Sequence, residues 1–314
     1  MSTIKEKYLN DLLKNNEGIK ILNKKFSTII TDKDFYKYGL LTQIIQTLIK
    51  NGYTQTISDN FNLILSSSLP DETFDILVLI KSIPNSNQLF SNNIEEIYLK
   101  LEGEEILEFI ELLDKSKQDE IFKRNEFSYN LYKEGFIRES TLGNIIKGDL
   151  SIFIEELIKE VSEGKKLESL EAGTYNDAIL TNDYVIKLGE TRDKFEIPYH
   201  PNILQPLLRE RIKDKNGKDI LIVEVQNKVD TKNITDLQRK ELIEKLSKAK
   251  ITCRDILYGN IGILLKPNQR ALFNGVGGIQ DYDDIKEETL QPGEPVIFDT
   301  DMIEKKDENN EPEK

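Results

Sequence analysis

The spacing of apolar residues divides the chain into two parts. From Ser2 to about Gly164 the apolar positions recur at helical intervals, as in Leu40, Ile44 and Leu48. Successive helices of about 12 to 18 residues with short connectors predict an antiparallel helical array. No repeat with the fixed period of a known solenoid family is evident in this part.

Local signals place several helix ends in this first part. Asn51-Gly52 follows an apolar stripe and is a typical C-cap, and Pro84 stops the next segment. Residues 82–93 are rich in Asn and Ser and predict a loop. Residues 149–151 open the last helix. The acidic run from Glu102 to Glu111 fits a solvated helix face better than an acidic binding face.

After Gly164 the pattern changes to that of strands. Residues 175–181 and 184–188 are strand-like runs separated by Asn182-Asp183, a tight-turn pair. Residues 203–212 and 220–225 form another such pair around Asn216-Gly217, a strong hairpin signal. Residues 168–226 therefore predict a small antiparallel sheet.

A helix and further short strands follow the predicted sheet. Thr235 and Gln238 have the spacing of a capping box. The predicted buried face of this helix comprises Leu237, Leu242, Ile243, Leu246 and Ala249. Apolar strands are expected at 261–265 and near 296–298. We expect three regions: an all-helical domain at 1–165, a second domain at 166–303, and a disordered acidic tail at 304–314.

Composition excludes several classes of function. The 314 residues carry a formal net charge of −13, which argues against binding to nucleic acid through phosphate attraction. One cysteine and one histidine exclude an internal disulfide framework and a His/Cys zinc site. Carboxylates, a lysine and a bound metal remain as the means for chemistry.

The sequence also limits where the protein is expected to act. No apolar run approaches the roughly 18 residues of a membrane span, and residues 1–13 lack the apolar core of a Sec signal peptide. A cytoplasmic location is therefore predicted. Delivery into a host cell by a signal-less route is an open alternative.

Five short motifs occur in the second part, in a fixed order. They are Gly173-Thr174-Tyr175, Val185-Ile186-Lys187, His200-Pro201-Asn202-Ile203-Leu204, Cys253-Arg254-Asp255 with Asn260, and Phe298-Asp299. This order resembles the protein-kinase-like fold, and in particular small bacterial kinase-like proteins. The resemblance implies an α+β fold class, in which an N-terminal helical array precedes a truncated protein-kinase-like domain with an antiparallel N-lobe sheet.

The resemblance assigns the nucleotide-binding residues. Lys187 would hold the α- and β-phosphates of ATP, beneath a glycine-rich loop at 173–175. Only Gly173 of the usual three glycines is present, so the backbone cradle for the phosphates is poorer. The glutamate partner of Lys187 would be Glu196, with Glu190 or a residue of the helical domain as alternatives. His200 would fix its loop through a hydrogen bond.

The resemblance also assigns the transfer chemistry. Asp255 would orient, or accept a proton from, the attacking hydroxyl group. Asn260 and Asp299 would hold Mg²⁺ through hard oxygen ligands, and Asp301 is a candidate for a further metal contact. The implied cofactors are ATP and Mg²⁺.

Departures from the family pattern keep several functions open. Leu257 stands where Ser/Thr kinases have a lysine, and the chain stops soon after Asp299, without an activation segment. The leading prediction is a phosphotransferase acting on a protein, with residues 1–165 binding the substrate or a regulator. The alternatives are a pseudokinase or nucleotide-binding module, a small-molecule phosphotransferase favoured by Gly259-Asn260-Ile261 and Asp299-Thr300-Asp301, and a purely structural interaction protein.

Overall fold

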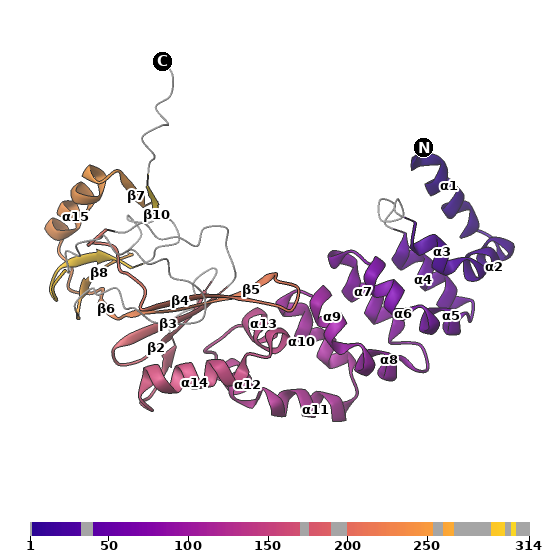
Figure 1. Cartoon of the computed structure of the whole chain (residues 1–314), viewed down its shortest axis with the longest axis horizontal. Helices are drawn as coiled ribbons and strands as arrows, with labels where there is room; N and C mark the ends of the chain where they lie inside the picture. The colour runs from indigo at the N-terminus through magenta and orange to yellow at the C-terminus, as the bar shows by residue number, and fades with distance from the viewer. Residues whose placement is uncertain are drawn as a thin grey trace, which may run out of the picture. The chain divides into compact units, whose positions relative to one another are not determined.

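The chain has an α+β fold with its helices concentrated in the N-terminal half (Figure 1). The computed structural model describes residues 2–32, 40–169, 176–189, 200–253, 260–266, 290–298 and 303–305. The chain folds into two compact units. The first comprises Met1–Asn130 and Glu139–Ile152, and the second comprises Leu131–Arg138 and Phe153–Lys314. The last helix before the strands therefore lies mainly with the sheet.

Fourteen helices precede the first strand in the described part of the chain. Their bounds are α1 Ser2–Leu12, α2 Asn16–Lys24, α3 Phe26–Ile30, α4 Leu41–Lys50, α5 Thr54–Asp59, α6 Phe61–Ser67, α7 Pro70–Ile80, α8 Ser86–Asn92, α9 Ile94–Lys100, α10 Gly103–Leu112, α11 Lys115–Arg124, α12 Glu126–Lys133, α13 Glu139–Gly148 and α14 Ser151–Ser162. None of the described helices is long and apolar enough to cross a membrane.

The prediction that the N-terminal half is helical is confirmed, but two details of it are wrong. The helices run from 5 to 12 residues, so they are shorter than expected. Residues 82–93, predicted as a loop, contain the helix α8. The Asn- and Ser-rich composition favours a loop locally, but burial of the Phe90 side chain anchors this segment as a helix.

Helices of the first unit pack against each other in a repeating pattern that was not visible in the sequence. The helix α4 packs on α7, α7 packs on α10, and α10 packs on α13, while α3 packs on α6 and α6 on α9. In these two series each helix packs against the third helix after it, as in stacked repeats. Because α4, α7, α10 and α13 begin at the unequal intervals 41, 70, 103 and 139, no fixed period is visible in the sequence.

An aromatic chain connects neighbouring groups of helices in this unit. Phe90 of α8 lies 6.1 Å from Phe61 of α6 and 5.5 Å from Phe109 of α10, measured between ring centroids. Tyr98 of α9 meets Phe109 edge to face at 6.0 Å. These tilted and edge-to-face contacts are favourable for aromatic pairs and give the stacked groups a shared core.

The second unit contains one larger antiparallel sheet and two small ones. A five-stranded sheet has the order β1-β2-β3-β5-β4, β10 pairs with β7, and β6, β8 and β9 form a three-stranded sheet in the order β6-β8-β9. The elements are β1 Glu168–Ser169, β2 Asn176–Leu180, β3 Tyr184–Gly189, β4 Leu208–Lys213, β5 Asp219–Asn227, β6 Val229–Asp230, α15 Asp236–Lys248, β7 Ile251–Cys253, β8 Ile261–Leu264, β9 Pro295–Ile297 and β10 Ile303–Lys305.

Both predicted hairpins are confirmed. The turn at residues 182–183 joins β2 to β3, and Gly217 adopts a positive φ of 81° in the turn between β4 and β5. A residue with a side chain is strained in that backbone conformation, so glycine suits the position.

Around α15 and the C-terminus, one prediction is confirmed and two need correction. The capping box forms as predicted, since Thr235 Oγ1 accepts from Gln238 N and Gln238 Oε1 accepts from Thr235 N. Leu237, however, is 67% exposed. At about 100° per residue, nine positions place Leu237 on the opposite side of the helix from the buried Leu246. Residues 304 and 305, predicted to begin the disordered tail, belong to the strand β10.

We predict that Gly143→Ala destabilises the first unit strongly. The helices α10 and α13 cross so closely that a Cβ atom on Gly143 would lie 1.6 Å from the backbone oxygen of Gly103. Separating the two helices should lower the free energy of unfolding by roughly 1 to 3 kcal/mol or more. Urea unfolding followed by circular dichroism measures this loss. The exposed Glu139→Ala in the same helix should change stability by no more than about 0.5 kcal/mol, and an equal effect of the two variants would contradict the proposed crossing.

Candidate functional site

In the second unit, two segments of the chain, 253–261 and 297–303, are joined to each other by strand pairing at both of their ends. In one pairing, Ile261 of β8 lies opposite Ile297 of β9, and the adjacent Phe298 N donates to Asn260 O at 3.2 Å. In the other, Cys253 of β7 lies opposite Ile303 of β10. The chain from 253 to 261 and the chain from 297 to 303 therefore share both anchoring points.

This arrangement concerns four of the predicted site residues. Asp255 and Asn260 belong to the first of the two fastened segments, and Asp299 and Asp301 belong to the second. The structure describes Asn260, which is partly exposed at the start of β8. The pairings bring the described ends of the two segments together, and Asp255, Asp299 and Asp301 themselves lie outside the described residues.

The strand β9 is held from both sides by the backbone. Its Ile297 pairs with β8, and on the other edge Ile297 N donates to Asn202 O at 2.9 Å while Leu204 N donates to Ile297 O at 2.8 Å. The side chain of Asn202 donates to Pro295 O at 2.9 Å. The motif at 200–204 is therefore an added edge of the small sheet.

His200 fixes this motif as the sequence predicted. Its Nδ1 accepts a hydrogen bond from Asn202 N at 3.1 Å, and its backbone oxygen accepts from Ile203 N at 2.9 Å. The alternating side chains then enter two cores. Ile203 packs with Ile297 and the buried face of α15, whereas Leu204 packs with Val296 on the other side.

Lys187 lies at the centre of the five-stranded sheet. It is directly opposite Glu224 of β5, and the two side chains share a face because opposed residues in antiparallel strands point the same way. Lys187 Nζ lies 3.9 Å from Glu224 Oε1, and the lysine side chain is 18% exposed. Among the described residues, its ammonium group donates no hydrogen bond. The lysine is thus held near a buried carboxylate.

A second cation shares the same carboxylate. Arg209 of β4 also lies opposite Glu224, and its Nη1 is 3.4 Å from Glu224 Oε2. Sequence reasoning missed both Glu224 and Arg209. The available signal was a single acidic residue inside the apolar run 220–225, which is unusual because a buried charge requires a partner.

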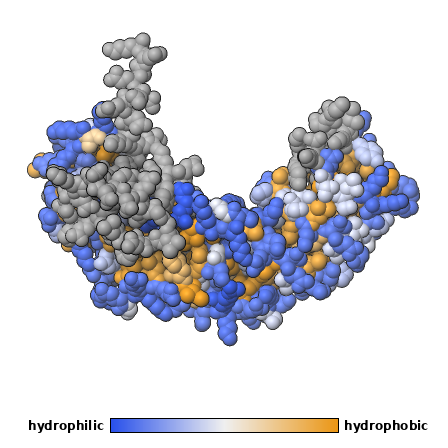
Figure 2. Space-filling model, viewed as in Figure 1, coloured by the Kyte–Doolittle hydropathy of each residue, from blue (hydrophilic) through white to orange (hydrophobic). Residues whose placement is uncertain are grey.

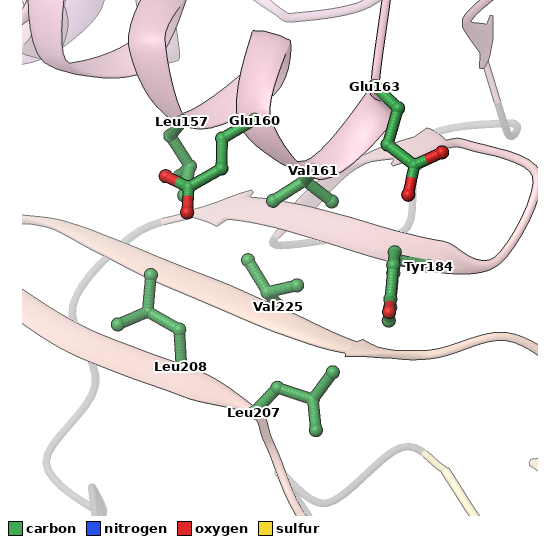
Figure 3. A pocket seen from close by; sticks show the side chains of 8 residues that line it. All are labelled: Leu157, Glu160, Val161, Glu163, Tyr184, Leu207, Leu208 and Val225. Carbon is green, nitrogen blue, oxygen red and sulfur yellow. The ribbon is translucent and has the colours of Figure 1, made fainter. Parts of the chain in front are cut away.

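The other face of the same sheet contains an apolar pocket. The pocket measures about 210 Å³ and lies between α14 and the strands (Figure 3). Figure 2 shows hydrophobic residues gathered over the same elements. The residues that line the pocket are Leu157, Glu160, Val161, Glu163, Tyr184, Leu207, Leu208 and Val225. Val225 and Leu208 neighbour Glu224 and Arg209 along their strands, so they point to the opposite face, and the pocket is separate from the Lys187 site.

Several predicted residues lie outside the described part of the chain. Lys187 and Asn260 are described; Lys187 lies in the five-stranded sheet, and Asn260 directly precedes β8 of the three-stranded sheet in the same unit. The strand β5 leads directly into β6, which pairs with β8 and so joins these sheets. Among the described residues there is no group of three metal-ligating side chains. The predicted site residues outside the described ranges are Gly173, Thr174, Tyr175, Glu190, Glu196, Asp255, Asp299 and Asp301.

We predict that Asn202→Ala loosens the attachment of the 200–204 motif to β9. Asn202 is 4% exposed, so its loss leaves Pro295 O without this buried donor. The free energy of unfolding of the second unit should fall by about 1 to 3 kcal/mol. Hydrogen exchange at the amides of Leu204 and Ile297 should quicken in parallel. Asn233→Ala removes an exposed asparagine and is the control; similar exchange in both variants would refute the attachment.

The chain matches no protein-family model, no curated protein and no solved structure.

Proposed function

We propose that the chain is an ATP- and Mg²⁺-dependent phosphotransferase with a protein-kinase-like nucleotide site. The observation that carries the proposal is the strand pairing at both ends of two segments, β7 with β10 and β8 with β9. Asp255 and Asn260 belong to one segment, and Asp299 and Asp301 belong to the other. Phosphoryl transfer depends mainly on positioning and on neutralising charge. Two segments that share both anchoring points are suited to gather oxygen ligands in one place.

Lys187 supplies the phosphate-binding cation in this proposal. Its position within a strand at the centre of a five-stranded sheet fixes the ammonium group, and its side chain is mostly buried. A partly desolvated cation attracts phosphate more strongly than an exposed one. The absence of hydrogen bonds from Lys187 to the described residues supports a role in binding a ligand.

The remaining roles follow the chemistry of the side chains. Asn260, Asp299 and Asp301 offer the hard oxygen ligands that Mg²⁺ prefers, and the ion would neutralise charge on the phosphates. Asp255 would orient the attacking hydroxyl group and accept its proton. The donor set consists of oxygen atoms only, which fits this metal and not a soft one.

We propose that residues 1–165 bind the protein that is the substrate or a regulator. The stacked helices α4, α7, α10 and α13 support this, because stacked repeats create extended surfaces for binding. Gly143 and Gly103 bring two of these helices close together, which keeps their relative position fixed.

We predict that ATP raises the thermal midpoint of unfolding only when Mg²⁺ is present. A ligand at 100 times its dissociation constant stabilises the native state by about 2.7 kcal/mol, which corresponds to several degrees. Lys187→Ala and Asp299→Asn should each abolish the shift, and chelation with EDTA should do the same. Asp255→Asn should retain the shift and eliminate transfer of labelled phosphate to protein.

Lys213→Ala is the matched control for this experiment. Lys213 lies on the same sheet, is 59% exposed and is near Asp219, so its loss should leave the shift intact. Absence of a shift for the wild-type chain at millimolar ATP would refute the proposed function. A shift without phosphate transfer would instead identify a pseudokinase, and transfer to a small molecule alone would identify a small-molecule phosphotransferase.

A further inference from the structure

Glu224 is a buried acidic residue whose position needs an explanation. The strand β5 is otherwise apolar from Ile220 to Val225, and it is covered on both faces. The Glu224 side chain is only 7% exposed. Burying a carboxylate costs free energy unless cations and hydrogen-bond donors compensate it, and a hydrophobic residue would pack at this position at no such cost.

In the described part of the chain, three side chains contact the Glu224 carboxylate. Lys187 Nζ is 3.9 Å from Oε1, Arg209 Nη1 is 3.4 Å from Oε2, and Gln226 Nε2 donates a hydrogen bond to Oε1. Lys187 and Arg209 come from the two strands on either side of β5, and Gln226 is two residues further along β5. All four residues therefore belong to the sheet itself.

The two cations lie at different distances from the Glu224 carboxylate and contact it differently. Arg209 is only 10% exposed and forms an ion pair with Oε2, while the hydrogen bond from Gln226 fixes the direction of the carboxylate. Lys187 is more exposed, and 3.9 Å is too long for a hydrogen bond. The carboxylate thus attracts the ammonium group electrostatically without using its N–H donors.

We propose that Glu224, oriented by Arg209 and Gln226, is the positioning residue for Lys187. This inference rests on the proposed function, in which Lys187 binds nucleotide phosphate. Because both residues lie in hydrogen-bonded neighbouring strands, the sheet holds the lysine in place beside the carboxylate. Among the described residues none accepts a hydrogen bond from Lys187 Nζ, so its N–H donors can point to phosphate oxygens.

The test compares Glu224→Gln with the matched variant Glu210→Gln. Glu210 is a partly buried glutamate on β4 that lies opposite Val223 and therefore on the other face of the sheet. Glu224→Gln should weaken binding of Mg²⁺-ATP about tenfold and leave binding of adenosine, which lacks phosphates, within about twofold. Glu210→Gln should change neither affinity. Equal loss of ATP and adenosine binding in Glu224→Gln would indicate general damage and overturn the inference.

A second measurement detects the ion pair without any nucleotide. In a double-mutant cycle, Lys187→Met and Glu224→Gln should be coupled by about threefold to thirtyfold in the unfolding equilibrium constant, measured with urea. An additive cycle, in a wild-type chain that binds Mg²⁺-ATP, would overturn the positioning role and leave the proposed function intact. If the chain binds no nucleotide, the proposed function is refuted. A coupled cycle in that case would make Glu224 part of a structural ion pair only.

Discussion

The second unit depends on the hydrogen bonds around Ile297. This residue pairs with Ile261 on one side and with the backbone of Asn202 and Leu204 on the other. A short strand between two partners has its backbone groups satisfied in a buried position, which is the condition for burying it at all. Three stretches that are distant in sequence meet there, and the cores on both sides form around them.

The five-stranded sheet separates packing from polar chemistry by alternation. One face of β3, β4 and β5 presents apolar residues, such as Val225 and Leu208, toward α14. The other face presents Lys187, Glu224 and Arg209. Since the side-chain period of a strand is two, the helix can cover one face while the charged residues stay on the other.

Local signals predicted the features that depend on neighbouring residues. The two hairpins and the Thr235 capping box are formed by groups within a few positions of one another, so turn and cap preferences suffice. Packing between distant segments decided the others. Phe90 is buried by residues from other helices and makes its segment helical, and Leu237 is exposed because the core lies against the opposite side of α15.

The sequence by itself determined the change from helices to strands, the order of the motifs and the choice of Lys187 and Asn260 as candidates. The first two follow from residue types and spacing along one chain, and the choice of the two candidates follows from the resemblance of the motifs to the protein-kinase-like fold. Only the tertiary structure decided that Glu224 and Arg209 face Lys187 and that β9 lies between β8 and the 200–204 motif. The physical reason is that strand register is set by burial and backbone pairing across the sheet, and neither is encoded in any short stretch of sequence.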